Sequence, residues 1–209
     1  MNAISVCVPT FNAGSHFRAM LESLRRQSRQ DFELIIGDNG STDGSIDVLA
    51  EFDFPRMKVL RHPRNLGYAG NCNAMIREAA GEFVAIYHCG DVYDPAILDI
   101  ESARLARGDV AGVFTQARLI DEDDRPMRSE WIQPIPCRDG ERILDLSAYL
   151  DLFLRDWKRP LICPTSMIRK SVYEELGGYD EKLRLIEDLD MWCRILQRER
   201  MCVIDRELI

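Results

Sequence analysis

No apolar run in this 209-residue sequence reaches the roughly 18 residues of a membrane-spanning helix, so no such helix is expected. Residues 1–10 also lack the basic segment and the long apolar segment of a signal peptide. The seven cysteines are odd in number, scattered and free of any CxxC pair, and several lie inside apolar runs. We therefore expect reduced thiols in the core of a cytosolic protein.

Basic residues are also in deficit, with 27 Lys and Arg against 35 Asp and Glu and a net charge of −8. This balance argues against a nucleic-acid partner, which needs a basic stripe. The negative net charge does not exclude a nucleotide ligand, because backbone N–H groups, a helix N-terminus or a metal can hold a single diphosphate. The length and the 46% apolar fraction allow a full core. Without repeats or a low-complexity linker, we expect one domain over residues 1–209.

The first half of the chain alternates short apolar runs with segments of helical periodicity. Apolar residues recur at intervals of three and four in the first expected helix: Phe17, Met20, Leu21 and Leu24. Strands are expected at 4–8, 32–36, 58–60 and 83–87, with a short helix at 46–52 and another ending at Ala80. This alternation predicts an α/β fold with a doubly wound, mostly parallel sheet and right-handed crossovers.

The second half is less regular. Helices are expected at 95–107, 146–154, 171–177 and 187–197, and strands or extended chain at 111–120, 161–168 and 201–204. Ser171 is the expected N-cap of its helix, which should end at Gly177 and Gly178. The acidic run 121–124 is interpreted as a solvated hairpin turn and 131–140 as a loop. The chain stops at Ile209, directly after an expected strand, and we expect it to be either a piece of a longer chain or a chain that has lost its C-terminal part.

Four polar or glycine-rich segments directly follow apolar strands, at 9–12, 38–41, 65–67 and 88–91. In an open parallel sheet, ligands bind beyond the carboxyl ends of the strands, so these segments should meet at one edge. Their clustering favours an enzyme or a nucleotide-binding protein.

The individual residues in these loops allow two interpretations each. Asp38 can accept a hydrogen bond from a base imide or a ribose hydroxyl, or it can shape an Asx turn. Asn65 and Gly67 can line a ligand or only shape their loop.

Carboxylates at the fourth strand end suit a hard divalent cation that also bridges phosphates. Asp94, which precedes Pro95, is better explained as a helix N-cap, so Asp91 is the better ligand candidate. His88 is either a second ligand or a polar neighbour of the site. Asp188 and its acidic neighbours Glu187 and Asp190 begin a helix, where they either complement the macrodipole or supply a general base.

Taken together, these motifs resemble the inverting family 2 glycosyltransferases. That family has a GT-A fold, a Rossmann-like and mostly parallel sheet flanked by helices, with a smaller mixed acceptor-side region. The resemblance runs in order from about residue 4 to 205, and its motifs are weak singly but specific together. The matching segments are 6–12, 32–45, 65–67 with Asn73, 80–86, 177–181 and 187–194. By this resemblance, residues 1–95 form the half that binds the nucleotide-sugar and residues 96–209 form the acceptor-side half.

The resemblance implies roles for particular residues. Asp38 would recognise the base, by analogy the uracil of a UDP-sugar. Asp188 would be the general base that deprotonates the acceptor hydroxyl, and Glu187 would shape the acceptor site. The residues implied on the nucleotide-sugar side are Pro9, Thr10, Asn12, Asp38, Asn39, Asn65, Gly67 and Asn73.

The resemblance also implies a divalent cation, Mg²⁺ or Mn²⁺, at Asp91 and His88, where it would neutralise the leaving diphosphate as a Lewis acid. The family's motif usually has acidic residues at the positions of His88 and Gly90, and here only Asp91 keeps its carboxylate. Three outcomes stay open: His88 and Asp91 suffice together with the donor phosphates, the enzyme works without metal, or activity is lost.

The function implied is transfer of a sugar from a nucleotide-diphospho-sugar to an acceptor hydroxyl with inversion, in polysaccharide or glycan biosynthesis. The acceptor would be a glycan or a lipid-linked glycan, and the protein would lie in the cytoplasm, including the inner face of the membrane. One alternative is a non-catalytic nucleotide-sugar-binding protein on the same fold. Another is a nucleotidyltransferase. That class of enzyme would need a glycine-rich, basic loop after the first strand to hold a triphosphate, but residues 9–14 contain no Lys or Arg.

Overall fold

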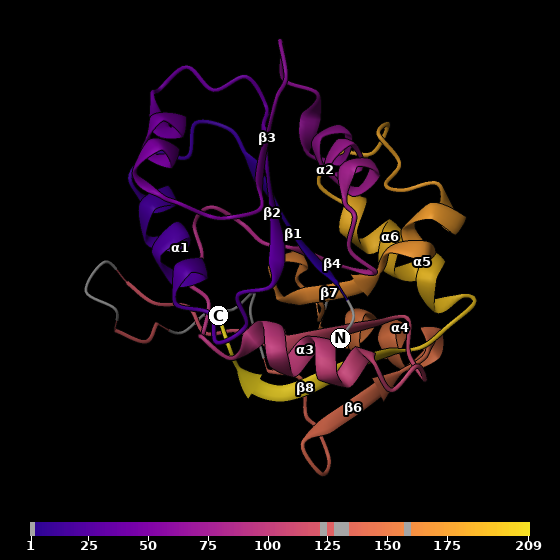
Figure 1. Ribbon diagram of the computed structural model, residues 1–209. Helices are drawn as coiled ribbons and strands as arrows, with labels where there is room; N and C mark the ends of the chain where they lie inside the picture. Colours follow the sequence, from indigo (N-terminus) through magenta and orange to yellow (C-terminus); the bar gives the residue numbers. More distant parts are fainter. Residues whose placement is uncertain (1–2, 122–124, 128–133, 157–159) are drawn as a thin grey trace.

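The structure, a computed structural model, describes residues 3–121, 125–127, 134–156 and 160–209. Its strands form one eight-stranded sheet in the order β3-β2-β1-β4-β7-β5-β8-β6 (Figure 1). The strands are β1 (Ile4–Thr10), β2 (Phe32–Asp38), β3 (Met57–Arg61), β4 (Phe83–Ile86), β5 (Gly112–Gln116), β6 (Glu141–Leu144), β7 (Ser166–Arg169) and β8 (Met201–Glu207). The α-helices are α1 (His16–Arg25), α2 (Gly67–Glu78), α3 (Ile97–Leu105), α4 (Leu146–Asp156), α5 (Lys170–Leu176) and α6 (Glu187–Leu196), and the 3₁₀ helices are η1 (Ser45–Glu51) and η2 (Cys163–Thr165).

The first four strands form the parallel half of the sheet. β1 pairs in parallel with both β2 and β4, and β2 pairs in parallel with β3. The pairing of β1 with β2 runs in register to the last pair, Thr10 with Asp38. The doubly wound parallel arrangement that the alternation predicts is therefore confirmed, and the loops after these strands leave the sheet at one edge.

The remaining strands form the mixed half. β7 lies antiparallel between β4 and β5, β8 is parallel to β5, and β6 is the antiparallel edge strand beside β8. β6 was not expected from the sequence, because its four residues, Glu-Arg-Ile-Leu, are too few and too polar to stand out as a strand. The mostly parallel sheet with a smaller mixed region is the architecture that the resemblance implies.

Several expected boundaries were wrong in this half. The strand expected at 111–120 ends at Gln116, and the segment expected at 161–168 is η2 followed by β7. Ser171 is not a cap: Arg169 is the N-cap residue of α5, and the backbone N–H of Lys170 donates to Glu82 O. Gly177 does end this helix, in the left-handed conformation that glycine favours (φ 75°).

Two other expectations fall partly outside the described residues. In the acidic run, 122–124 are not described, and Ile120 forms an antiparallel bridge with Pro126 across it. In the expected loop, 131–133 are not described, and Arg138 forms a bridge with Glu141.

Apolar side chains fill both faces of the sheet, because successive strand residues point to opposite sides. On one face, α1, η1 and α3 pack against residues such as Val6, Val8 and Ile36. On the other face, α2, α4, α5 and α6 pack against residues such as Cys7 and Ile35 (Figure 1). All seven cysteines are free thiols, as expected, and four of them are buried: Cys7, Cys72, Cys163 and Cys202.

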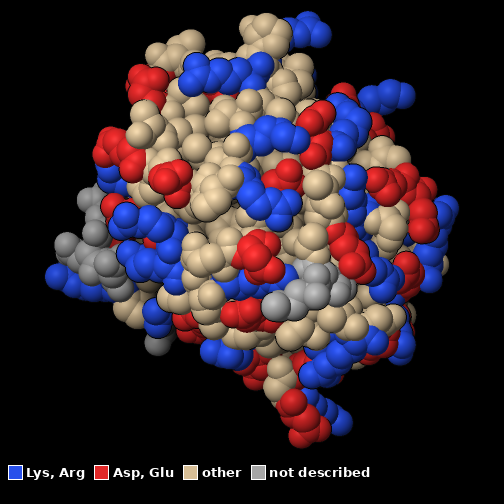
Figure 2. All heavy atoms as spheres, in the orientation of Figure 1, with Lys and Arg blue, Asp and Glu red and all other residues tan. Residues whose placement is uncertain are grey.

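The charged side chains do not gather by sign on the face shown in Figure 2, where Lys and Arg alternate with Asp and Glu. Among the residues described, no helix combines the length and the apolar character that crossing a membrane requires.

Helix α2 approaches β2 closely at Gly37, and this contact fixes the position of the helix. A side chain at Gly37 would lie 2.7 Å from Met75 Sδ and closer still to the Asn71 carboxamide. The Asn71 Nδ2 group donates to Gly37 O over 2.7 Å, and Asn71 Oδ1 lies 3.1 Å from His62 Nε2. The missing side chain and these hydrogen bonds together seat α2 on the sheet.

We therefore expect Gly37→Ala to lower the free energy of unfolding by about 1–3 kcal/mol, because the added methyl group overpacks this contact. Gly90→Ala is the matched control, since nothing lies within 4 Å of a side chain there, and it should stay within about 0.5 kcal/mol of the native protein. Urea unfolding measures both. Equal stabilities for the two variants would contradict the contact at Gly37.

Candidate functional site

The loops that follow β1 and β2 are joined by hydrogen bonds. Asn39 N donates to Thr10 O over 2.8 Å, which continues the pairing beyond the strands. Asn12 exchanges two bonds with the second loop: its N–H donates to Ser41 Oγ (3.0 Å), and its Oδ1 accepts from Thr42 N (2.9 Å). Thr10 and Asn12, two of the predicted nucleotide-side residues, are thus brought to the same place as the second loop.

Asp38 is buried at the end of β2, and its Oδ1 accepts a hydrogen bond from Ser41 N over 2.9 Å. The turn-shaping interpretation of this residue is therefore seen directly. A carboxylate has a second oxygen, so the turn does not use up its accepting capacity. Recognition of a base by Asp38 stays a prediction.

An asparagine pair ties the second loop to the start of α2. Asn39 is buried; its Nδ2 donates to Asn65 Oδ1 (2.9 Å) and Gly67 O (3.1 Å), and its Oδ1 accepts from Leu66 N (2.7 Å). Asn65 Oδ1 also accepts from Gly67 N over 2.8 Å, and Gly67 has a left-handed backbone with φ of 79°. Three of the predicted residues, Asn39, Asn65 and Gly67, therefore form one connected network, whose contact with a nucleotide stays a prediction.

Asn73 lies further along α2 and points to the acceptor-side half. Its Nδ2 donates to Tyr179 O (2.9 Å) and Glu181 Oε1 (3.0 Å), and its Oδ1 accepts from Tyr179 N (2.8 Å). Both of its amide hydrogens are thus used inside the protein. The structure shows Asn73 as the link between α2 and the segment after α5, and its predicted place beside the nucleotide stays untested.

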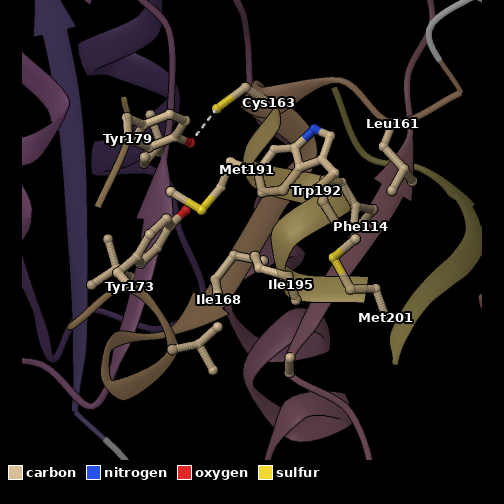
Figure 3. Close-up of a cluster of buried hydrophobic side chains, with 14 of the residues drawn as sticks. Phe114, Leu161, Cys163, Ile168, Tyr173, Tyr179, Met191, Trp192, Ile195 and Met201 are labelled. Atoms are coloured by element: carbon tan, nitrogen blue, oxygen red, sulfur yellow. Dashed lines mark hydrogen bonds between the residues drawn. The ribbon is translucent and has the colours of Figure 1, made fainter. Parts of the chain in front are cut away.

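His88, just beyond the end of β4, contacts Tyr68 and through it reaches Cys163, and neither of these residues was predicted from the sequence to belong to the site. Its Nε2 lies 3.0 Å from Tyr68 Oη, and the same hydroxyl donates to Cys163 Sγ over 3.0 Å. Cys163 in turn faces the hydroxyl of Tyr179 at 3.7 Å (Figure 3). Burial lowers the pKa of His88 to about 4, so its imidazole is neutral at pH 7. Tyr68 directly follows the Asn-Leu-Gly motif, but nothing in that motif indicates a partner 20 residues away.

Asp91 is partly buried three residues beyond His88. Burial raises the pKa of its carboxyl to about 6. It borders a pocket of about 410 Å³ together with Arg26 and Arg118. Asp94 Oδ1 accepts from Ala96 N over 2.8 Å, so Asp94 caps the turn that leads into α3, although Ala96 is the cap residue of the helix itself.

The described residues contain no group of three or more His, Cys, Asp or Glu side chains placed to hold a metal ion. Asp91 and His88 could together offer one carboxylate oxygen and one imidazole nitrogen. Mg²⁺ sites with substrate phosphates commonly use only one or two protein carboxylates, so this small donor set fits a cation that takes its other ligands from a diphosphate and water.

Glu187 and Asp188 are the first two residues of α6. Glu187 borders a pocket of about 510 Å³ whose wall also includes Asn65, Gly67 and Tyr68. Burial raises the pKa of Tyr68 and of Cys163, and the negative charge of Asp188 raises both further. The acidic start of α6 therefore lies close to the loops that follow the parallel strands.

For the protein without metal, we expect Asp91→Asn to raise the free energy of unfolding by about 1–3 kcal/mol at pH 8. The folded pKa of Asp91 lies above its usual value, so the ionised carboxyl destabilises the fold as pH rises through about 6. The gain should shrink as the pH falls towards 4, where the native carboxyl is protonated in the fold. Urea unfolding in EDTA across this pH range measures it, and a gain that does not change with pH would contradict the burial of this charge.

Known proteins are similar to this chain in sequence or in fold. The chain is 27% identical over 208 residues to the uncharacterized protein MT1568 of Mycobacterium tuberculosis, covering 98% of this chain and 65% of that protein. It superposes on S. aureus TarS, solved in complex with UDP-GlcNAc, with a TM-score of 0.80 at 19% identity, covering 99% of this chain and 57% of TarS. It also superposes on the mannosyltransferase PcManGT from Pyrobaculum calidifontis, solved with GDP-Man and Mn²⁺, with a TM-score of 0.69 at 17% identity, covering 98% and 54%.

The chain thus spans less than two thirds of the length of each of these proteins. The two structural likenesses confirm the GT-A fold. The model of the family described as glycosyl transferase family 2 matches residues 5–177, well over half of the chain. With the polar strand ends and the acidic start of α6 in the places described above, the chain belongs to glycosyl transferase family 2.

Proposed function

We propose that this chain transfers a sugar from a nucleotide-diphospho-sugar, a UDP-sugar, to an acceptor hydroxyl with inversion at the anomeric carbon. The observation that carries the proposal is the pocket shared by Asn65, Gly67 and Glu187, in which donor-side loops and the start of α6 border one space. Membership of family 2 and the likeness to TarS, whose structure contains UDP-GlcNAc, support it.

In this proposal, the joined loops after β1 and β2 hold the nucleotide. Asp38 would accept the imide N–H of uracil with the oxygen that the turn leaves available. Pro9, Thr10 and Asn12 would form one wall of the site, and Asn39, Asn65, Gly67 and Asn73 its other side. Because Asn39, Asn65 and Gly67 are already tied to each other and Asn12 is tied to the loop after β2, little ordering of these residues would be needed when the nucleotide binds.

Asp188 would act as the general base. It would take the proton of the acceptor hydroxyl while that oxygen attacks the anomeric carbon from the side opposite the diphosphate. The new C–O bond forms as the bond to the diphosphate breaks, and the nucleotide diphosphate leaves with the electron pair. A single displacement of this kind inverts the anomeric centre. Glu187, one residue earlier in α6, would shape the acceptor side.

A divalent cation, Mg²⁺ or Mn²⁺, would be held by Asp91 and His88 and would neutralise the charge of the leaving diphosphate. A carboxyl with its pKa near 6 is mostly ionised at pH 7 and above, as a metal ligand must be.

The remaining parts of the proposal follow from the family. The acceptor would be a glycan or a lipid-linked glycan, and the chain would work in the cytoplasm, including the inner face of the membrane. The chain would act as one domain, with the donor half ending near residue 95. The loss of acidic residues at His88 and Gly90 favours a second candidate, a protein that binds the nucleotide-sugar but does not transfer it.

We expect the chain to bind UDP and Asp38→Asn to weaken that binding about tenfold, the value of a lost charge-assisted hydrogen bond. The asparagine can keep its Oδ1 acceptor for Ser41 N, but it presents an N–H group where the imide of uracil also donates. Calorimetry with UDP measures the effect, and Asp53→Ala, on an exposed loop, is the control.

The same titrations with Mg²⁺ or Mn²⁺, repeated on Asp91→Ala, test the cation. Metal that strengthens UDP binding in the native chain but not in this variant supports the site at Asp91. Absence of binding by any nucleoside diphosphate would end the donor-site assignment.

Asp188→Asn should lower sugar transfer by at least about 100-fold while leaving UDP affinity unchanged, because a carboxamide cannot take the acceptor proton. Asp190→Asn is the matched control: Asp190 lies in the same helical turn, but it pairs with Arg194 over 2.7 Å. UDP release from a panel of UDP-sugars, with glycan acceptors added, measures transfer. UDP binding without transfer by the native chain would favour the binding-only alternative, and equal activity in both variants would remove Asp188 from the mechanism.

A further inference from the structure

The hydroxyl of Tyr68 lies between the donor-side loop and the acceptor-side half. It is 3.0 Å from His88 Nε2 on one side and 3.0 Å from Cys163 Sγ on the other. The Tyr68 ring meets the His88 ring edge-on at 5.6 Å and the Tyr179 ring at 6.2 Å. Three elements that are distant in sequence, the start of α2, the end of β4 and η2, therefore meet at one oxygen atom.

The hydrogens at this oxygen can be counted. A tyrosine hydroxyl has one hydrogen, and here it is donated to Cys163 Sγ. The bond to His88 must then run in the other direction, with Nε2–H donating to the Tyr68 oxygen. A neutral imidazole has one N–H, so Nδ1 carries the lone pair.

The backbone of His88 is held as well. Its N–H donates to Tyr93 Oη over 2.7 Å, and the Tyr93 ring stacks on Tyr87 at 4.0 Å. With the main chain and Nε2 both committed to tyrosines, Nδ1 is the nitrogen of His88 that is left for a ligand. A bare nitrogen repels phosphate oxygens but binds a divalent cation, and Asp91 lies three residues away.

We propose that Tyr68 is a positioning residue of the donor site, which fixes His88 as the Nε2–H tautomer so that Nδ1 ligates the cation beside Asp91. This inference rests on the proposed function, because it needs a donor diphosphate at the end of β4. Outer partners of this kind orient a metal-binding histidine and set which nitrogen binds. Through Cys163, Tyr68 also ties the ring to the acceptor-side half.

The first measurement is the tautomer of His88 in the free protein, by long-range ¹H–¹⁵N spectra of ¹⁵N-histidine-labelled chain. The sequence contains three histidines, and His88→Asn identifies the signals of His88. His62 is an internal reference, because its Nε2 faces Asn71 Oδ1 at 3.1 Å and must also carry the hydrogen. We expect an unprotonated Nδ1 in His88, whose resonance moves when UDP and Zn²⁺, a diamagnetic probe, are added. A protonated Nδ1, or a shift at Nε2 in place of Nδ1, would overturn the proposal.

The second measurement is UDP affinity in Tyr68→Phe, by calorimetry with and without Mn²⁺. Loss of an outer partner should weaken the metal-dependent affinity about tenfold and leave the metal-free affinity within about twofold. Tyr173→Phe is the matched control, because the Tyr173 ring lies 5.9 Å from the Tyr179 ring, which Tyr68 also contacts, while the Tyr173 hydroxyl has no hydrogen-bond partner among the described residues.

A role for Tyr68 in packing alone would instead weaken both affinities equally, which would contradict the proposal. Failure of the native chain to bind any nucleoside diphosphate would overturn the donor site, and with it this role of His88. The tautomer in the free protein separates the two failures, since it depends on Tyr68 and on no ligand.

Discussion

The in-register parallel pairing of β1 with β2 is the constraint on which the loops after the parallel strands depend. Because Thr10 pairs with Asp38, the two strands end at the same level and their loops start side by side. The bond from Asn39 N to Thr10 O continues the ladder into those loops. A slip of one residue would turn Asp38 to the opposite face of the sheet and would misplace Asn39 as well. The apolar faces of both strands prevent that slip, since it would expose their buried side chains.

Helix α2 connects the loops after the parallel strands to the segment that follows α5. Asn71 fastens it to Gly37 near the end of β2, and Asn73 fastens it to the backbone of Tyr179. Tyr68, at its start, contacts His88 and Cys163. One helix of twelve residues therefore sets the spacing between the loops after the parallel strands and the segment around Tyr179, and two of the three side chains that do so, Asn71 and Asn73, are buried.

The elements that the sequence predicted well are those with a strong local signal. The apolar runs of β1, β2 and β4 and the periodicity of α1 are complete within a few residues. The rule that loops after parallel strands meet at one edge predicted that the loops after β1 and β2 lie together, and hydrogen bonds join them in the structure. The mixed half was harder, because β6 and β7 are short and become strands only through their neighbours in the sheet. The same difference is seen among the site residues. The turn at Asp38 involves only neighbouring residues and was predicted from the sequence. The contact of Tyr68 with His88 joins distant segments and carries no local signal.

The strand order also constrains how the sheet is completed. β8 lies between β5 and β6, and the described backbone of β6 pairs with β8 along its length. The segment Glu141–Leu144 is made about 60 residues before its partner, so during synthesis its ladder with β8 cannot form until Met201–Glu207 emerge. Contacts so distant in sequence are formed late and slowly. The mixed half of the sheet is therefore the part in which a nascent chain is most exposed to mispairing, whereas the parallel half can close as soon as β4 has left the ribosome.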